Sequence, residues 1–162
     1  MKVILPIVFL GNIEYYSMLK NADEIFFDQH GHYIKQNFRN RAEMYGDSGK
    51  LDLIIPVQKH SNHTAMKDIK ISYDHDWRRK HWKSIASAYR SSPYFEFYEE
   101  DFEPIFKAKY EYLVEFNLAL QNKILEMLGI EINSTFSKEH HKEIEGFENF
   151  RGYFTPKQKS LE

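Results

Sequence analysis

Cysteine is absent from this chain of 162 residues. Its absence excludes disulfide bonds, thiolate metal sites and cysteine nucleophiles. A chain without cysteine is typical of a reducing compartment, so we expect a cytoplasmic location.

Long hydrophobic runs and an excess of charge of one sign are also missing. No window approaches the ~18 consecutive apolar residues of a membrane span, and Pro6 and Glu14 interrupt the first apolar run, unlike a signal peptide. The formal net charge is −2, whereas a general nucleic-acid binder is usually strongly basic. We therefore expect no membrane span and no binding of nucleic acid.

Several sequence motifs of catalysis are missing as well. There is no glycine-rich phosphate loop, no GxSxG elbow and no HExxH helix. The histidines fall in pairs whose spacing does not match a metal site, namely His30 with His32, His60 with His63, His75 with His81, and His140 with His141. The prediction is no bound metal and no cofactor.

The length suits a single domain with a sizeable core, here residues 1–162. Asn12 is a suitable N-cap for a short helix over 13–20. Apolar and β-branched runs predict strands over residues 3–9, 25–27, 51–57, 69–73 and 130–132.

Helical periodicity dominates the second half. Asp74 or Asp76 would cap a helix that runs to about Ser91, and Gly129 would end a helix over 110–128. A shorter helix is predicted over 100–108 with Pro104 in its first turn, preceded by a packed aromatic cluster at 94–98. The prediction is an α/β fold, with a mixed sheet from the N-terminal half packed against helices of the C-terminal half.

Residues 33–41, YIKQNFRNR, concentrate positive charge in Lys35, Arg39 and Arg41. Arginine binds carboxylates and phosphates through two parallel hydrogen bonds. An extended chain would place these three cations on one face and Gln36 and Asn40 on the other. The segment is therefore either an anion-binding site or a charged, solvated strand edge.

Two further side chains are candidates for chemistry. His81 lies on an apolar helical stripe with Trp77, where a partly buried imidazole is either a general base or a hydrogen-bonded core residue. Asp28 follows a predicted strand, and sites of α/β proteins often gather at such ends. It would orient a substrate amine or a nearby cation, or else cap the next turn.

The segments IFFDQHGHYIKQNFRNR, LIIPVQK and DIKISYDHDWRRKHWKSIASAYRSSPYFEFY resemble the WbqC-like family, in its Bacteroidetes-type form. The similarity extends over nearly the whole chain. Relatives continue past the position of Lys159, so this chain is either a short or a C-terminally truncated member. They also open with a different N-terminal turn where this chain has IVFLGN.

The resemblance implies a role in surface-polysaccharide clusters, such as attaching glycine or a similar group to a sugar. Carried over by position, it marks Lys35, Gln36, Arg39, Asn40, Arg41, Trp77, His81 and Tyr89. The first hypothesis is a transferase in which Arg39 and Arg41 bind an anionic small-molecule donor (an activated sugar, acyl or aminoacyl group), Gln36 and Asn40 orient it, and His81 accepts a proton.

Two other hypotheses remain open at this stage. One is a non-catalytic binding or scaffold protein associated with envelope biogenesis, whose many aromatic residues would contact a partner. The other is nucleic-acid binding through arginine and lysine next to aromatic residues, which the net charge disfavours. The oligomeric state does not follow from the sequence.

Overall fold

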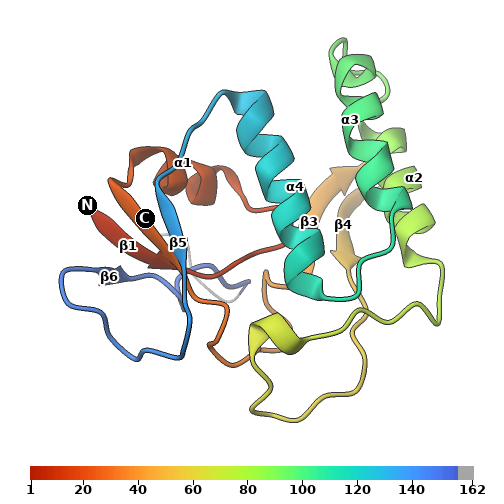
Figure 1. Cartoon of the computed structure of the whole chain (residues 1–162). Coiled ribbons are helices and arrows are strands. Elements are labelled where there is room, and N and C mark those ends of the chain that lie inside the picture. The colour runs from red at the N-terminus through yellow and green to blue at the C-terminus, as the bar shows by residue number, and fades with distance from the viewer. Residues whose placement is uncertain (157–162) are drawn as a thin grey trace.

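A computed structural model describes residues 1–156. Its main sheet has four parallel strands in the order β5 (Ser134–Phe136), β2 (Glu24–Phe27), β1 (Lys2–Leu5) and β6 (Glu148–Asn149). The sheet and helix α1 (Ile13–Asn21) lie at one end of the molecule (Figure 1). Helix α1 starts as predicted, because the Asn12 side chain accepts a hydrogen bond of 2.9 Å from the amide of Tyr15.

A separate antiparallel hairpin forms from β3 (Arg41–Gly46) and β4 (Gly49–Ile54). The turn pairs Gly46 with Gly49, and Gly49 has φ +105°, a conformation that suits glycine. The strand predicted over 51–57 is thus the second strand of this hairpin, and it starts and ends earlier than expected. Its partner β3 begins where the extended segment 33–41 was predicted to end.

Three long helices complete the fold: α2 (Trp77–Tyr89), α3 (Phe95–Lys107) and α4 (Leu113–Leu128). The prediction for α3 is wrong in its start, because residues 95–98 belong to the helix and Pro104 lies in its last turn. Phe95, Phe102 and Phe106 recur at helical spacing and face the core, which favours one continuous helix. Gly129 ends α4 with φ +61°, as predicted.

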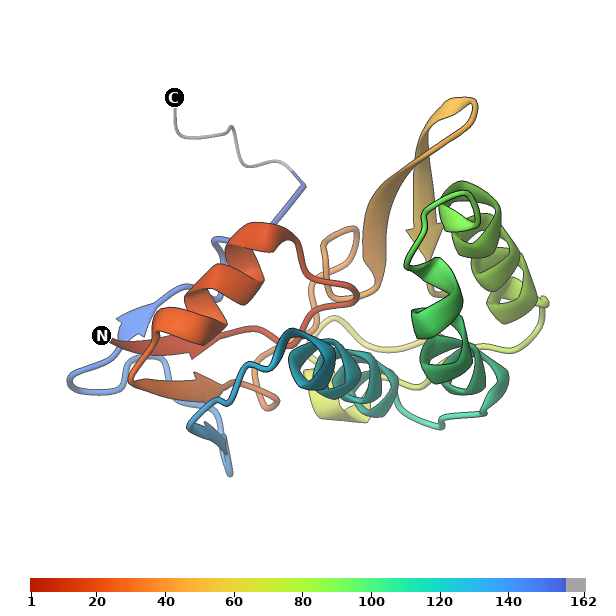
Figure 2. The same cartoon turned by 90° about the horizontal axis from the view of Figure 1, so that it is seen from above.

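Two hydrophobic clusters form the core, and α4 contributes to both. Val114 and Leu125 pack with the sheet and α1, whereas Leu113, Phe116 and Leu120 pack with the hairpin and the other helices. Figures 1 and 2 show α4 between the two ends of the molecule. The α/β class is confirmed, and the parallel sheet also takes two strands from the C-terminal part of the chain.

Other predicted elements differ from the structure. Residues 69–73 make only isolated bridges, through Lys70 and Ile71, and the strand predicted at 130–132 lies instead at Ser134–Phe136. A short 3-10 helix, η1 (Met66–Asp68), interrupts the predicted loop 58–68. Within residues 1–156, none of the helices combines the length and the apolar character that crossing a bilayer requires. The expectation about the chain end near Lys159 concerns residues outside those described.

Candidate functional site

The carboxyl ends of the parallel strands meet at one edge of the sheet. Because all four strands run the same way, the residues that follow them come together there. Asp28 follows β2, Ser137 follows β5 and Arg151 lies two residues beyond β6. These three side chains are the framework of the candidate site.

Asp28 is a buried carboxylate, 6% exposed, at the centre of this edge. Its Oδ2 accepts a hydrogen bond of 2.7 Å from Nη1 of Arg151, and its Oδ1 accepts one of 2.8 Å from the amide of Gly31. The hydroxyl of Ser137 also donates to Oδ1, at 3.4 Å. Both roles suggested by the sequence are therefore present, since Asp28 caps a turn and pairs with a cation. A Cβ on Gly31 would lie 2.6 Å from Oδ2, so any larger residue here would displace the carboxylate of Asp28.

Arg151 is held in place by groups from two segments. Its Nη1 also donates to the carbonyl of His141 at 2.6 Å, and its Nη2 donates to the carbonyl of Lys142. Its Nε donates to Oδ1 of Asn149 at 3.1 Å. Arg151 thus ties the end of β6 to the loop after β5 and to Asp28, and the charge of Asp28 stabilises it.

Arg39 brings a second guanidinium to this edge. It is 7% exposed, and its guanidinium makes one hydrogen bond among the described residues, from Nη2 to the carbonyl of Arg151 at 3.4 Å. Burial lowers the pKa of Arg39, and the charge of nearby Asp28 opposes that effect. Two arginines against one carboxylate give the three charged groups a formal charge of +1. Arg39 therefore has N–H donors left to bind an anion.

Imidazole side chains from three loops surround the same edge. Nδ1 of His30 lies 3.0 Å from the hydroxyl oxygen of Ser137, and Nδ1 of His140 lies 4.0 Å from Oδ2 of Asp28. The ring of His32 stacks on His140, with centroids 5.8 Å apart, and lies 5.1 Å from the ring of His63. Three of the histidine pairs noted in the sequence thus contribute to one cluster. No group of three or more potential ligands within residues 1–156 has the arrangement of a metal site.

The segment 33–41 folds as a series of turns, so the predicted extended ladder is wrong. Oδ1 of Asn37 accepts a hydrogen bond of 2.9 Å from the amide of Arg39, an Asx turn that reverses the chain locally. Arg39 is consequently buried, whereas Lys35 and Gln36 are exposed, and Gln36 has φ +57°. The three predicted cations do not share a face.

Two buried asparagines attach this segment to the rest of the fold. Nδ2 of Asn40 donates to the carbonyl of Ile55 at 3.0 Å, and Nδ2 of Asn117 on α4 donates to the carbonyl of Arg39 at 2.7 Å. Both donors therefore fix the backbone next to Arg39. The buried Nε of Arg41 has no hydrogen-bond partner among the described residues.

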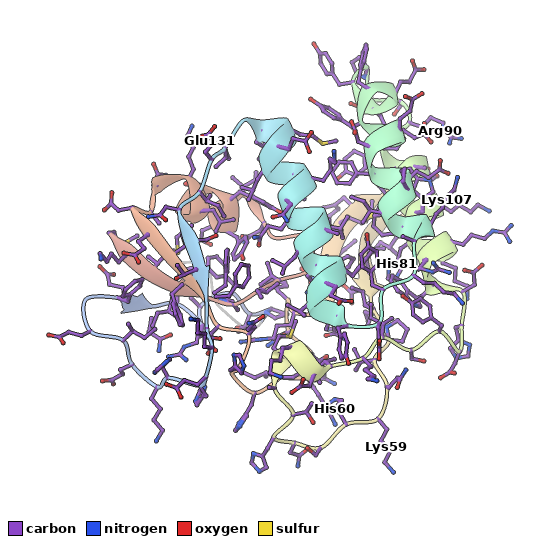
Figure 3. All side chains as sticks on the ribbon, viewed as in Figure 1. Lys59, His60, His81, Arg90, Lys107 and Glu131 are labelled. Carbon is purple, nitrogen blue, oxygen red and sulfur yellow. The ribbon has the colours of Figure 1, made fainter. Side chains whose placement is uncertain are left out.

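His81 lies in the other half of the molecule, on α2, with its ring 6.2 Å from Phe9 and 5.3 Å from Trp77 (Figure 3). It is 8% exposed, and burial lowers its pKa from 6.5 to about 4, so the imidazole is neutral at pH 7. Trp77 donates from Nε1 to the carbonyl of Ser72 at 3.0 Å, as a core tryptophan does.

Phe9 links the two regions, because its amide donates to the carbonyl of Phe38 at 2.7 Å while its ring stacks on His81. Sequence reasoning noticed Asp28 and missed Ser137, Arg151 and the histidine cluster. The available signal was weak: Ser137 and Arg151 follow strands of three and two residues, of which the first was predicted a few residues too early and the second was not predicted. The histidines of the cluster come from loops far apart in the sequence.

The sequence matches the WbqC-like protein family over residues 8–149, a range that contains Asp28, Arg39, Ser137 and His81. Arg151 lies just beyond the matched range. No curated protein and no solved structure matches this chain.

Proposed function

This chain belongs to the WbqC-like protein family, and we propose that it is a group transferase of bacterial surface-polysaccharide or amino-sugar modification. It would move an aminoacyl or acyl group from an activated donor to a sugar. The observation that carries the proposal is the positively charged edge of the sheet, where Asp28 pairs with Arg151 while Arg39 keeps unpaired donors.

The donor's anionic group would bind Arg39. Activated acyl, aminoacyl and sugar donors all carry phosphate or carboxylate, and a guanidinium binds either of them through two parallel bonds. Arg39 is well suited because the bonds from Asn37 and Asn117 hold its backbone on both sides. A preorganised cation loses little entropy when the donor binds.

The transfer itself would be a substitution at the donor's carbonyl carbon. The amine or hydroxyl of the sugar attacks this carbon, the bond to the leaving group breaks, and an imidazole takes the proton of the nucleophile. The leaving group departs as an anion, and Arg39 stabilises its charge.

Two imidazoles compete for the role of proton acceptor. His81 was the choice from the sequence, but a pKa of about 4 makes it a weak base at neutral pH, and it is packed among aromatic rings. His30 is partly exposed and lies beside Ser137 at the charged edge, which favours it as the acceptor. Lys35 and Gln36 are exposed on the turn before Arg39 and would contact the sugar.

A screen of thermal shifts and turnover tests the proposal, using nucleotide sugars, acyl thioesters and aminoacyl phosphates. The Arg39→Lys variant keeps the charge but loses the forked geometry, so we expect donor affinity to fall at least tenfold. Arg90→Ala, which removes an exposed arginine at the far end of α2, is the matched control and should bind like the wild type. Equal binding by all three proteins would contradict the role of Arg39.

The same screen separates the two imidazoles. If His30 is the acceptor, His30→Gln lowers kcat at least a hundredfold, whereas His81→Phe leaves kcat within a few fold of the wild type. The opposite result would return the role to His81. Turnover unaffected by both variants would remove general-base catalysis by either residue.

A non-catalytic binding or scaffold role is the second candidate, and one observation favours it. The tip formed by α2 and α3 exposes aromatic side chains, with Tyr94 66% and Phe97 75% exposed. Exposed aromatic residues of this kind are enriched in protein interfaces. A stoichiometric protein partner lost in Phe97→Ser, together with no donor binding, would favour this role over the transferase.

A further inference from the structure

An apolar cavity of about 500 Å³ lies between the β3–β4 hairpin and helices α2, α3 and α4. This volume is within the range of ligand-binding cavities. Figure 2 shows the hairpin, α2 and α3 grouped at the end of the molecule opposite the sheet. Neither Arg39, Asp28 nor His81 lines the cavity, so it is distinct from the site at the sheet edge.

The chemistry of the walls restricts what the cavity can hold. Of the fifteen residues that line it, only Glu43 is charged, and its carboxylate already pairs with Lys50 at 2.7 Å. The other polar groups of the lining are the indole N–H of Trp82 and the hydroxyls of Tyr89 and Tyr98. A charge or a set of hydroxyl groups buried here would lose its hydration and gain few partners, which is unfavourable. The lining therefore favours a ligand that buries hydrocarbon.

The cavity runs beside helix α3. Its lining includes Phe95 and Phe106, which lie near opposite ends of that helix. A flexible aliphatic chain can follow a wall of this kind, because each of its methylene groups packs separately against the side chains. The wall is built by packed rings, since Trp82 on α2 lies 6.1 Å from Phe95 and 5.6 Å from Phe106.

Two further features indicate a formed entrance and wall. Tyr89, Tyr98 and Leu128 line the cavity and are exposed, so they lie at its mouth. Leu10 also lines it and has φ +46°, a conformation that leucine rarely adopts. The surrounding fold must impose this strained backbone, as is common at binding sites.

We propose that this cavity binds one aliphatic chain of an amphipathic ligand, such as a fatty acyl group, with the polar head outside the exposed mouth. The inference goes beyond the proposed function and does not depend on it, because chain binding can be measured whether or not group transfer occurs.

Calorimetric titration of the full chain with decanoate, dodecanoate and tetradecanoate, all below their micelle concentrations, tests the proposal. Each methylene buried in the cavity should strengthen binding, by up to about fourfold, until the chain fills the cavity. Ile85→Trp, which places a large ring in the cavity, should weaken binding at least tenfold. Lys80→Trp, on the exposed face of the same helix, is the matched control and should bind like the wild type.

A second measurement shows where the aliphatic chain of the ligand binds. A fatty acid brominated near its end should quench the fluorescence of Trp82, which lines the cavity, and the quenching should disappear in Trp82→Phe, where Trp77 remains. Thermal unfolding of each variant shows whether it is folded.

A third measurement shows whether the aliphatic chain belongs to a membrane lipid or to a soluble ligand. Cosedimentation with phosphatidylglycerol vesicles that is lost in Ile85→Trp would identify a membrane lipid, and binding of only the dissolved fatty acids would identify a soluble acyl ligand. The proposal is overturned if neither probe binds saturably, or if folded Ile85→Trp binds both as the wild type does. It is also overturned if sedimentation velocity shows a dimer that Ile85→Trp abolishes, because a second copy would then occupy the cavity.

Discussion

The half of the molecule that contains the parallel sheet buries charged side chains at the edge of that sheet. The half built from the hairpin and helices α2, α3 and α4 instead packs apolar side chains around a cavity. Asp28, Arg39 and Arg151 are partly or fully buried in the first half. Asp28 pairs with Arg151, and loop carbonyls accept hydrogen bonds from both guanidinium groups. In the second half, His81 is a buried ionisable group whose Nδ1 has no hydrogen-bond partner among the described residues, and its imidazole stays neutral at pH 7.

The difference shows two ways in which a small domain keeps polar groups in its interior. Where strand ends and loops converge, many backbone carbonyls are available, so charges can be buried with partners. Where helices pack, the backbone groups are already paired within the helices, so a buried polar side chain must lose its charge. We therefore expect an anion to bind at the sheet end of the molecule and an aliphatic ligand to bind at the opposite end.

The strongest loss of stability is expected when one partner of the buried ion pair in the sheet half is removed. Asp28→Asn leaves the guanidinium of Arg151 without its counter-ion, and we expect the free energy of unfolding to fall by about 3–5 kcal/mol. Glu111→Gln, which removes the exposed ion pair of Lys70 with Glu111 at 2.6 Å, should cost no more than about 1 kcal/mol. Urea denaturation of both variants measures the two values, and equal losses would contradict the distinction between the two pairs.

The second effect concerns the neutral imidazole of the helical half. The folded state holds the pKa of His81 at about 4, below the unfolded value of 6.5, so between these pH values the unfolded chain binds more protons. The neutral imidazole of His81 contributes its full stabilisation above pH 6.5. As the pH falls toward 4, the free energy of unfolding decreases by about 2–3 kcal/mol.

His81→Phe tests this pH dependence. The difference in unfolding free energy between wild type and variant should change by that amount from pH 7 to pH 4, in favour of the variant. Ser84→Ala, which changes no titratable group on the same helix, provides the control and should leave the difference flat. A flat difference for His81→Phe would mean that its imidazole gains a proton in the folded protein as readily as in the unfolded one.

The weakest effect on stability is expected in the segment that joins the two halves. Gln36 has φ +57°, where glycine is favoured, so Gln36→Gly should raise the free energy of unfolding by up to about 1 kcal/mol. Lys35→Gly, in the same turn at an ordinary backbone angle, should lower it by about 0.5–1 kcal/mol. If both variants destabilise the protein equally in thermal unfolding, the turn is not strained at Gln36.

The helix ends of the fold could be predicted from local residues. Asn12 is the N-cap of α1 and Gly129 is the C-cap of α4, and each lies directly next to the helix that it ends. The apolar periodicity of α4 is also visible in the sequence. The start of α3 was missed, because the aromatic residues at 94–98 were assigned to a packed cluster before the helix and not to the helix itself. Strands β5 and β6 have three and two residues, too few for a recognisable alternation.

The candidate site was predicted only in part. Arg39 is at the charged edge, but Lys35 and Gln36 of the same motif point to solvent because Asn37 turns the chain between them and Arg39. The transferase hypothesis from the sequence requires Arg39 and His81 to act on the same donor, but the apolar cavity between the hairpin and helices α2, α3 and α4 is lined by neither residue.

The α/β class, the family, the absence of thiol chemistry and the caps of two helices follow from the order of the amino acids alone, since each depends on composition or on residues close together in the chain. The contacts of Asp28 with Ser137 and Arg151 arise only when the chain folds. Ser137 and Arg151 lie 109 and 123 positions after Asp28, and parallel pairing of β2 with β5 and of β1 with β6 brings the three residues together. No local pattern encodes that pairing, because the free energy that selects it comes from burying the whole sheet.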